Sequence, residues 1–429
     1  MIKRVIQKLT KSEVTKNSVW LIAERIIQMI FSLVINRIVA EYLQPGNYGT
    51  LSYAASIVAF FTSLCTLGLD AIIINEIVNK KEEQGEILGT SIFMRIVSSL
   101  LSMILIAIVV IFLNPNNMEI LIITILHSLT LIFDAFNVIN IWYQSKLKSK
   151  YTAIIAFIVY IIISALKVYF VFTDKQVIYF ALINTLTSFL TMMFTYILYV
   201  KQKGPKLKVD KKRIKPLLKQ SYHFILSGLM IAIYAQTDKV MIGKMLTDMS
   251  AVGLYSVATT ITSLWSFIPA AIITSFRPVI IEAKLISYDK YIKRLKQLYS
   301  LILWINIAYA LGVTIFADLI IKLLYGEAYI GAKIPLLFAV WSGGFSYIGV
   351  ARDIWFVSEG LQGYSTKISI FGCLTNVVLN LILIPQFGIV GAAIATTITQ
   401  IFTGFISTLL FKKTRNNSKY ILEALFLKF

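Results

Sequence analysis

The stretch IVSSLLSMILIAIVVIFL, residues 96–113, runs for 18 residues without one charged side chain. Its polar residues are three serines, Ser98, Ser99 and Ser102. The apolar core of a bilayer is about 30 Å thick, and a helix rising 1.5 Å per residue crosses it in roughly 20 residues. The stretch therefore predicts a transmembrane helix.

Stretches of this kind fill most of the chain. Of its 429 residues, 58% are hydrophobic and 14% are charged, and the mean hydropathy is +0.78, whereas soluble domains carry roughly 25% charged residues. We expect an all-α polytopic membrane protein with about 12 transmembrane helices. The predicted spans are residues 18–40, 48–72, 88–113, 119–142, 151–172, 177–200, 218–243, 252–276, 298–318, 334–357, 365–385 and 388–411. Turn-forming residues separate them, notably Pro45-Gly46-Asn47 and Pro385-Gln386.

The distribution of basic residues predicts the orientation. Of the 41 lysines and arginines, 31 lie in one alternating set of gaps, counting both termini, and 4 lie in the other set. Because positive residues are retained in the cytoplasm, both termini are expected on the cytoplasmic side of an inner (plasma) membrane, with an even number of spans. The net charge of +20 is spread over these short gaps, which argues against a nucleic-acid-binding face.

Residues of the types that carry catalysis or bind metals are scarce. Cys65 and Cys373 lie inside apolar runs, and His127 and His223 stand alone without metal-ligand spacing. No paired carboxylates, nucleophile triad or metal cluster occurs outside the spans. We therefore expect no catalytic residue, no metal and no cofactor, and the chain is not predicted to be an enzyme.

The chain is predicted to consist of two halves. The segment Tyr48–Ala54 (YGTLSYA) resembles Val252–Ala258 (VGLYSVA), which lies 204 residues later. Six spans in each half indicate parallel repeats about an axis normal to the membrane, around a central cavity. The expected parts are a cytoplasmic amphipathic N-terminus (1–17), a first lobe (18–200), a basic cytoplasmic linker (201–217), a second lobe (218–411) and a cytoplasmic tail (412–429).

A second amphipathic segment precedes the span at 298–318. Leu285, Ile292, Leu295 and Tyr299 share one helical face beside basic residues. As for the N-terminus, this pattern predicts a helix lying on the anionic cytoplasmic leaflet.

Ionisable side chains inside the spans are the candidates for lining the cavity, because a charge in lipid is costly. Arg25, Arg95 and Asp134 are favoured as cavity residues on this ground, whereas serines and threonines more often form hydrogen bonds between helices. For Arg25 the alternative is a buried ion pair with Asp70 or Asp134. Arg37 lies near a span end, where its side chain can reach water. The full set of candidate cavity residues is Arg25, Gln28, Arg37, Arg95, Asp134, Asp238, Lys239 and Arg352.

Three motifs carry a family resemblance. Leu43–Gly49 (LQPGNYG), Thr237–Gly243 (TDKVMIG) and Phe387–Ala393 (FGIVGAA) are similar to signatures of bacterial polysaccharide flippases. The family is the O-antigen/capsule repeat-unit (Wzx-type) branch of the MOP exporter superfamily. The resemblance implies a MATE-like fold of two six-helix lobes. It also implies transfer of undecaprenyl-pyrophosphate-linked oligosaccharide from the cytoplasmic to the outer leaflet. In such flippases a basic residue of the first span lines the cavity, and Arg25 occupies the matching position.

The physics of the cargo agrees with that resemblance. A diphosphate needs positive donors, and arginine keeps its charge when buried. The polyprenyl tail can stay among the membrane lipids while the head group crosses by alternating access, driven by cargo or by a coupling ion, H+ or Na+. The protein would then work with glycan polymerase machinery.

Two other functions compete with this one. A MATE-type multidrug or cation antiporter would favour acids over arginines in the cavity. A membrane polysaccharide polymerase or ligase usually needs a sizeable outer loop, whereas the outer gaps here are a few residues long.

The topology can be tested directly. Reporter fusions at Lys211 and at Phe429 should both report the cytoplasm, and a fusion at Asn116 should report the outside, because lysine-rich gaps stay inside. Opposite locations for Lys211 and Phe429 would contradict the division into six and six spans.

Overall fold

The computed structural model describes the backbone of residues 13–427, and the side chains of residues 31–427 except Ser227. The predicted amphipathic residues at the N-terminus fall largely outside this part. All described elements are helical. In the first half they are α2 (Glu13–Thr66), α3 (Asp70–Asn79), η1 (Lys81–Glu83), α4 (Gln84–Leu113), α5 (Met118–Ser128), α6 (Thr130–Asp134), α7 (Asn137–Ser145), α8 (Ser149–Phe172) and α9 (Val177–Lys201). The second half contains η2 (Lys211–Arg213), α10 (Ile214–Met245), α11 (Met249–Leu264), α12 (Phe267–Ile286), α13 (Tyr288–Leu324), η3 (Glu327–Ala332), α14 (Lys333–Ser358), α15 (Gln362–Ile401), the π-helical turn η4 (Phe402–Ile406), α16 (Ser407–Leu410) and α17 (Arg415–Leu425).

Ten helical stretches among the described residues are long and apolar enough to cross a membrane. Two long helices contain a residue with non-helical backbone angles, Gln44 in α2 (φ 57°, ψ 167°) and Gly388 in α15 (φ 57°, ψ −136°). Both lie at the predicted breaks beside Pro45 and Pro385, and a positive φ is easiest for glycine. The prediction of an all-helical polytopic membrane protein is confirmed.

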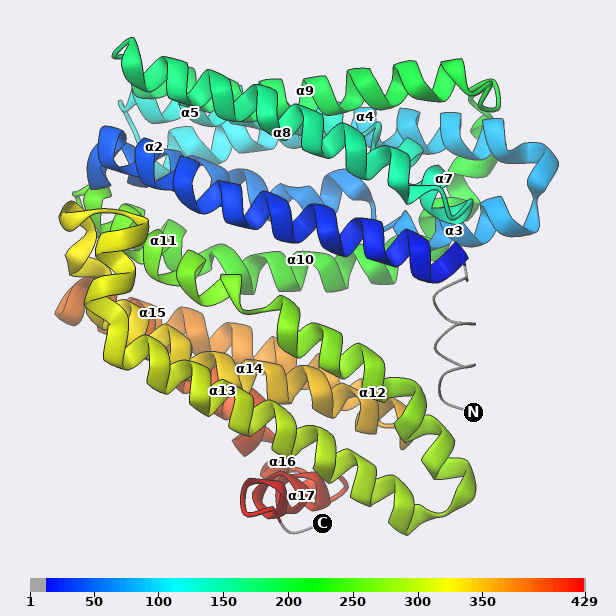
Figure 1. Cartoon of the computed structure of the whole chain (residues 1–429), viewed down its shortest axis with the longest axis vertical. Coiled ribbons are helices and arrows are strands. Elements are labelled where there is room, and N and C mark those ends of the chain that lie inside the picture. The colour runs from blue at the N-terminus through cyan, green and yellow to red at the C-terminus, as the bar shows by residue number, and fades with distance from the viewer. Residues whose placement is uncertain (1–12, 428–429) are drawn as a thin grey trace. The chain divides into compact units, whose positions relative to one another are not determined.

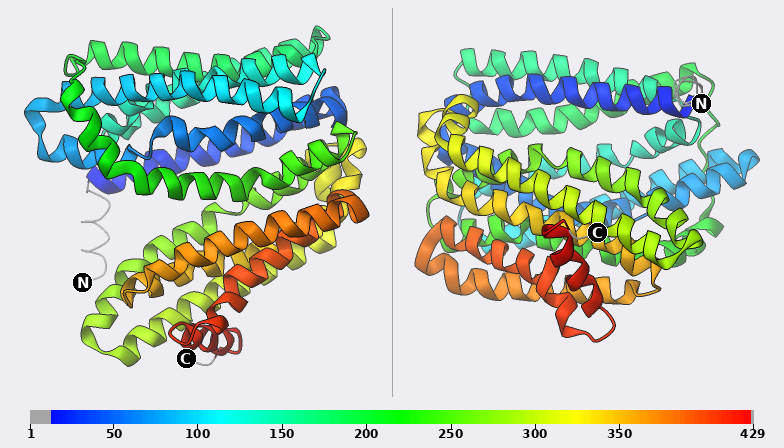
Figure 2. Two further views of the ribbon diagram at one scale, coloured as in Figure 1. Left: turned by 180° about the vertical axis from the view of Figure 1, so that it is seen from behind. Right: turned by 60° about the horizontal axis from the view of Figure 1, so that its bottom comes forward.

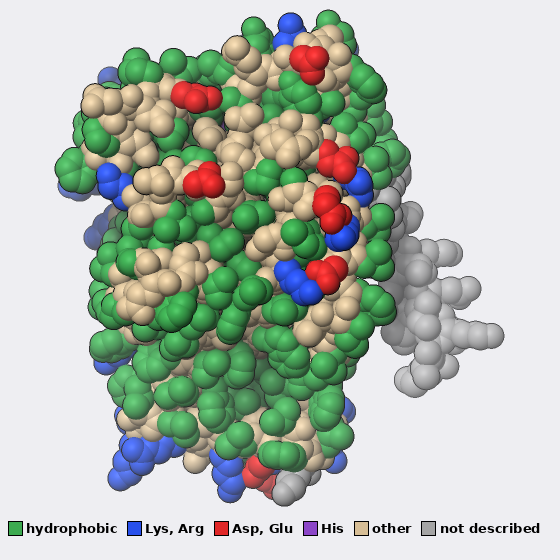
Figure 3. Space-filling model, turned by 90° about the vertical axis from the view of Figure 1, so that its left-hand side faces the viewer, with side chains coloured by type: hydrophobic (Ala, Val, Ile, Leu, Met, Phe, Trp, Pro, Cys, Tyr) green, Lys and Arg blue, Asp and Glu red, His purple; other side chains and the backbone are tan. Residues whose placement is uncertain are grey.

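The surface of these helices is apolar in the way that lipid requires. On α4 the side chains of Leu101, Ile104, Ile108 and Phe112 are each more than half exposed. Soluble proteins rarely expose contiguous apolar patches of this kind, and a bilayer covers them. Figure 3 looks onto one end of the helices, where acidic and basic side chains lie among the hydrophobic ones.

Contacts divide the chain into two compact units. Unit 1 contains the residues up to Leu43 and Tyr53–Ala232, and unit 2 contains Gln44–Ser52 and Ile233–Phe429. The division falls inside α10, not at the predicted linker, and a short piece of α2 belongs to unit 2. The division into two working lobes at 201–217 stays a prediction.

In unit 1, α9 packs against α5, α6 and α8 (Figure 1). The core lies where α3, α4 and α7 meet, and its buried side chains include Ile73, Leu88, Val138 and Trp142. The pass formed by α5, α6 and α7 is interrupted at Leu129 and again before Asn137.

In unit 2, α14 packs between α13 and α15 (Figure 2). Leu295 and Tyr299 of α13 are fully buried in the core of this unit. The prediction that this face lies on the lipid leaflet is therefore wrong for Ile292, Leu295 and Tyr299, which pack against the protein itself. Leu285 belongs to α12 and is 85% exposed, so for this residue the prediction stays open to test. An amphipathic pattern identifies an apolar face but not what covers it.

The tail is ordered as helix α17, which packs against α13. Asn417 is fully buried and donates a hydrogen bond of 2.8 Å to the hydroxyl of Tyr299. Lys296 forms an ion pair of 2.5 Å with Glu423 on the same helix. The end of the chain is thus part of unit 2.

The two similar segments meet within unit 2. Gly49 of α2 lies against Gly253 of α11, so that a Cβ on Gly49 would be 2.8 Å from the backbone nitrogen of Gly253. The contact is reciprocal, because a Cβ on Gly253 would overlap the carbonyl of Pro45, and one on Gly49 would overlap the carbonyl of Met249. Gly49 and Gly253 are 204 residues apart, as are Pro45 and Met249, which is the spacing of the repeat.

Tyrosines complete this crossing. The ring of Tyr48 packs edge-on against Tyr325 and Tyr329, with centroid distances of 6.1 and 5.8 Å. Small residues let two helix backbones approach this closely in a membrane. The piece of α2 that follows Gln44 is therefore held in unit 2 by backbone contact and by aromatic packing.

The substitution Gly253→Ala tests this crossing. It should lower the free energy of unfolding in detergent by about 1–3 kcal/mol, because the new methyl group forces the backbones apart. Gly312→Ala on α13 is the matched control, since a Cβ there meets nothing within 4 Å. It should leave stability unchanged or raise it by about 0.5–1 kcal/mol. Equal melting temperatures for the two variants would contradict the close crossing.

Candidate functional site

A buried carboxylate lies at the centre of a polar network in unit 2. Asp238 on α10 is 7% exposed. One carboxylate oxygen accepts a hydrogen bond of 2.6 Å from Asn380. The other oxygen accepts hydrogen bonds of 2.5 Å from Tyr255 and from Thr396. Three helices therefore converge on one acidic side chain.

The network continues along α15. Asn380 donates a hydrogen bond of 3.2 Å to Asn376, and Asn376 donates one of 3.2 Å to Thr396. Asn376 and Asn380 are 1% and 0% exposed. They lie on one face because residues four apart are neighbours on a helix.

The break in α15 makes this arrangement possible. Asn376 and Asn380 precede Gly388, whereas Thr396 follows it. Gly391 lets the two segments approach, because a Cβ there would overlap the carbonyl of Leu383. The network thus depends on a backbone bend that the glycines permit.

Asp238 forms no salt bridge with a lysine, arginine or histidine in the described part of the chain, but Lys239 interacts with it electrostatically. Lys239 is the next residue on α10 and is half-buried, but adjacent positions are about 100° apart around a helix. An unpaired buried charge is costly even when it is hydrogen-bonded.

A free acceptor lies in the same network. The side-chain oxygen of Asn380 is buried and has no hydrogen-bond partner. Together with the oxygens of Asp238, Asn376 and Thr396 it offers a set of hard oxygen ligands with one negative charge. Such a set suits a proton on the carboxylate or a small monovalent cation among the oxygens.

The other predicted residues lie elsewhere. In unit 1, Arg95 on α4 is 1% exposed and forms an ion pair with Asp70, at the start of α3. The guanidinium Nε of Arg95 is buried without a partner. Arg37 pairs with Glu41 at 2.6 Å, and both side chains are exposed, as expected near a span end. Asp134 is exposed and ends α6, beside a break in its helical pass.

Arg352 belongs to unit 2. It is 4% exposed and donates a hydrogen bond to the carbonyl of Thr403 in the π-helical turn η4. It also lies 3.7 Å from the carboxylate of Asp353 and over the ring of Phe356. The side chains of Arg25 and Gln28 on α2 lie outside the described residues. The cavity role of all eight candidates stays a prediction.

Residues 14–284, more than half of the chain, match the protein family described as "Polysaccharide biosynthesis protein". The chain belongs to this family. The matched range ends within α12, so it includes Asp238 and Tyr255 but not the residues contributed by α15. The family prediction from the three motifs is confirmed.

Two curated relatives come from Haloferax volcanii. The chain is 23% identical over 193 residues to a protein described as probable low-salt glycan biosynthesis flippase Agl15, covering 45% of this chain and 41% of that one. It is 27% identical over 186 residues to probable flippase AglR, covering 39% and 36%. The matches therefore span less than half of these relatives. Both are described as flippases and not as enzymes.

Solved structures share the fold over nearly the whole chain. An inward closed conformation of lipid II flippase MurJ has a TM-score of 0.74 at 15% identity, covering 96% of this chain and 90% of that one. An inward-facing MATE multidrug transporter of the MOP superfamily has a TM-score of 0.69 at 17% identity, covering 95% and 99%. The chain is a multi-pass membrane protein with a MurJ- and MATE-like fold.

Sequence reasoning identified Asp238 but not its partners. The partners of Asp238 are neutral, and neutral polar residues in a span usually form hydrogen bonds between helices. These partners and the residue that links them are Tyr255, Asn376, Asn380 and Thr396. A usable signal was the pair Asn376 and Asn380, spaced by four in the apolar run 365–385. What remained hidden is that Thr396 folds back beside them.

Substitutions at Asp238 should distinguish its charge from its hydrogen bonds. Asp238→Ala should lower the free energy of unfolding by about 1–3 kcal/mol, because it leaves buried donors without an acceptor. Asp238→Asn keeps a carbonyl oxygen and removes the unpaired charge, so it should be less destabilising than alanine, or neutral. Thermal unfolding in detergent at neutral pH provides the measurement. Equal losses from both substitutions would contradict an uncompensated charge at this position.

Proposed function

We propose that this protein moves a lipid-linked oligosaccharide, with a polyprenyl diphosphate such as undecaprenyl diphosphate as its anchor, from the cytoplasmic to the outer leaflet. The observation that carries the proposal is the family match over residues 14–284. The flippase descriptions of both relatives and the fold shared with a lipid II flippase support it. O-antigen or capsule repeat units are the class of cargo that the motifs favour.

The proposed architecture has twelve passes in two lobes. Ten stretches are long enough to span, and the breaks at Gln44 and Gly388 each divide one of them into two passes. Both termini are proposed to lie in the cytoplasm of a bacterial inner membrane, as the lysine distribution favours. Arg25 on the first pass and the other arginines are proposed to meet the diphosphate, because a guanidinium keeps its charge in lipid.

The network around Asp238 is proposed to bind the coupling ion. An uncompensated buried carboxylate gains most from a proton or a cation, and a transporter moves uphill only if the ion favours one conformation over another. Asp238 lies on α10, a helix that contributes to both units. Ion binding there would act on the element that joins them.

A MATE-type antiporter is the second candidate. Its support is the fold shared with a multidrug transporter and the acid at the centre of the network. A polymerase or ligase has no comparable support, since both curated relatives are described as flippases.

Purified protein in proteoliposomes tests both candidates. A polyprenyl-diphosphate-linked oligosaccharide should reach the opposite leaflet with its mass unchanged, and an inward-directed Na+ or H+ gradient should accelerate the transfer. Asp238→Asn should abolish the acceleration by the gradient while slower downhill transfer persists. Asp318→Asn is the control, because Asp318 is an exposed acid paired with Lys333 at 2.6 Å.

Each other outcome points to a different function. Export of an organic cation without movement of the glycolipid would favour the antiporter. An increase or decrease in the mass of the glycan would favour an enzyme. Full gradient dependence in Asp238→Asn would remove this network as the coupling site.

A further inference from the structure

The linker between the two halves is held in place against unit 1. Residues 205–210 form no helix or strand, and the backbone nitrogen of Lys208 donates a hydrogen bond of 3.1 Å to the carbonyl of Gly85. The backbone nitrogen of Asp210 donates one of 2.9 Å to the hydroxyl of Thr90. Tyr199 donates a hydrogen bond to the carbonyl of Pro205. A linker that only connected two halves would not need these contacts.

Two glycines one turn apart fix the register. A Cβ on Gly85 would overlap the carbonyl of Lys206, and a Cβ on Gly89 would lie 2.6 Å from the nitrogen of Lys208. The backbone of the linker therefore lies directly on the first turns of α4. Leu207 packs against the core of unit 1, while Lys206 and Lys208 on either side of it are exposed.

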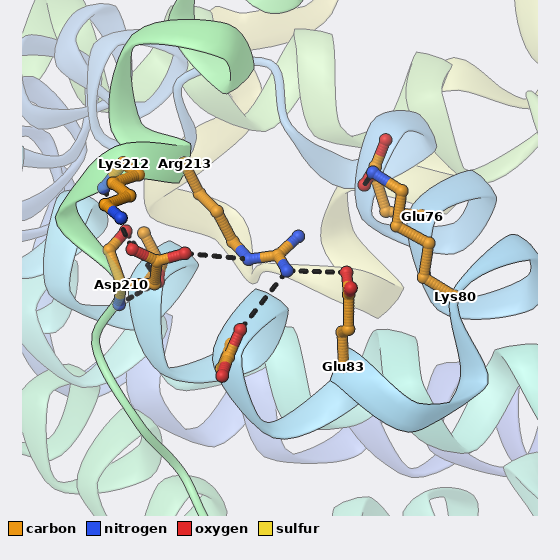
Figure 4. A network of polar contacts seen from close by, with 8 residues as sticks. Glu76, Lys80, Glu83, Asp210, Lys212 and Arg213 are labelled. Atoms are coloured by element: carbon orange, nitrogen blue, oxygen red, sulfur yellow. Dashed lines mark hydrogen bonds and ion pairs between the residues drawn. The ribbon is translucent and has the colours of Figure 1, made fainter.

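Nearby acids are already bound to one arginine. Arg213 pairs with Glu83 at 2.5 Å, with Glu86 at 3.2 Å and with Asp210 at 3.3 Å (Figure 4). Lys80, also drawn in Figure 4, pairs with Glu76 at 2.7 Å. These acids thus have partners other than the lysines of the linker.

The lysines that remain form a cluster without internal partners. Lys206, Lys208, Lys211 and Lys212, here called the linker lysine cluster, are all exposed. No ion pair joins any of them to an acid in the described part of the chain. Val209, between them, is 50% exposed. An exposed apolar residue flanked by lysines is typical of a segment at the level of lipid head groups.

We propose that the linker lysine cluster is a docking surface for the diphosphate head group of the lipid-linked donor in the cytoplasmic leaflet, before transport. This inference rests on the proposed function and names a site for the first encounter with its cargo. Lysine ammonium groups bind phosphate as point charges. A fixed group of four favours a head group with two phosphates over phospholipids with one, because the attraction grows with charge. The function of the linker lysine cluster is to raise the local concentration of the lipid-linked donor at the protein.

The retention of positive loops in the cytoplasm is the alternative explanation for these lysines. That rule depends on the number of charges near a span and not on how the loop is held. The docking proposal requires both the charge and the fixed backbone, so the two explanations can be separated.

The test uses purified full-length protein in neutral phosphatidylcholine proteoliposomes. A short-chain polyprenyl-diphosphate-linked monosaccharide is the probe, and the initial transfer rate is measured against its surface density. Lys206→Gln with Lys208→Gln should raise the half-saturating density at least about fivefold with little change in the maximal rate. That factor corresponds to roughly 1 kcal/mol, the contribution of one lysine near an anionic surface.

Two further variants separate charge from position. Gly89→Ala keeps every charge and favours the helix, but its methyl group displaces the linker. Like the double lysine substitution, it should raise the half-saturating density of the donor. Lys146→Gln with Lys148→Gln removes two exposed lysines from the same predicted side of the membrane and should behave as wild type. Thermal unfolding of each variant shows that the protein is folded.

The outcomes are distinct. Wild-type kinetics in Lys206→Gln/Lys208→Gln, or an equal effect in the Lys146/Lys148 control, overturns the docking surface and leaves the proposed function standing. Wild-type kinetics in folded Gly89→Ala overturns the requirement for a fixed linker. Complete competition by phosphatidylglycerol at the same surface density as the donor overturns the preference for a diphosphate. If wild-type protein transfers nothing, the proposed function fails, and binding of the same probe in nanodiscs then tests the cluster alone.

Discussion

Lipid offers no hydrogen bonds, and every polar group of a membrane-spanning segment must find its partner inside the protein. This constraint explains why all described elements are helical. It also explains where the exceptions occur. The breaks at Gln44 and Gly388 separate proposed passes, and the residues beside them are exposed, so water can reach their backbone groups. The π-helical turn lies within a proposed pass, and there the carbonyl of Thr403 accepts a hydrogen bond from the buried Arg352.

The same constraint separates two kinds of buried charge in this chain. Arg95 forms an ion pair with Asp70 in unit 1, so its charge is compensated. Asp238 has three donors, and among the described residues it forms no ion pair of the kind that joins Arg95 to Asp70, although Lys239 interacts with it electrostatically. Hydrogen bonds orient a carboxylate but leave its net charge in place. Of the two residues, Asp238 is therefore the one whose environment changes most when an ion arrives or leaves.

Much of the fold could be predicted because hydropathy and helix-breaking residues act locally. The apolar run that ends at Leu113, and the breaks at Pro45 and Pro385, are visible in the sequence itself. The partners of buried charges are not local. The sequence allows Asp70 as a partner for Arg25, but in the structure Asp70 pairs with Arg95. Thr396 meets Asn376 only because α15 bends at Gly388. The covering of Tyr299 by α17 likewise depends on where the tail returns, and no periodicity within either helix specifies it.

The contact between Gly49 and Gly253 has a consequence for the changes that this crossing tolerates. Each glycine lies against the other, and the residues four positions earlier, Pro45 and Met249, make the mirrored contact. A two-fold arrangement of similar segments produces this reciprocity, because one patch then contacts its own counterpart. A side chain added to either glycine meets a backbone carbonyl of the other helix, so a side-chain change on that other helix cannot make room for it.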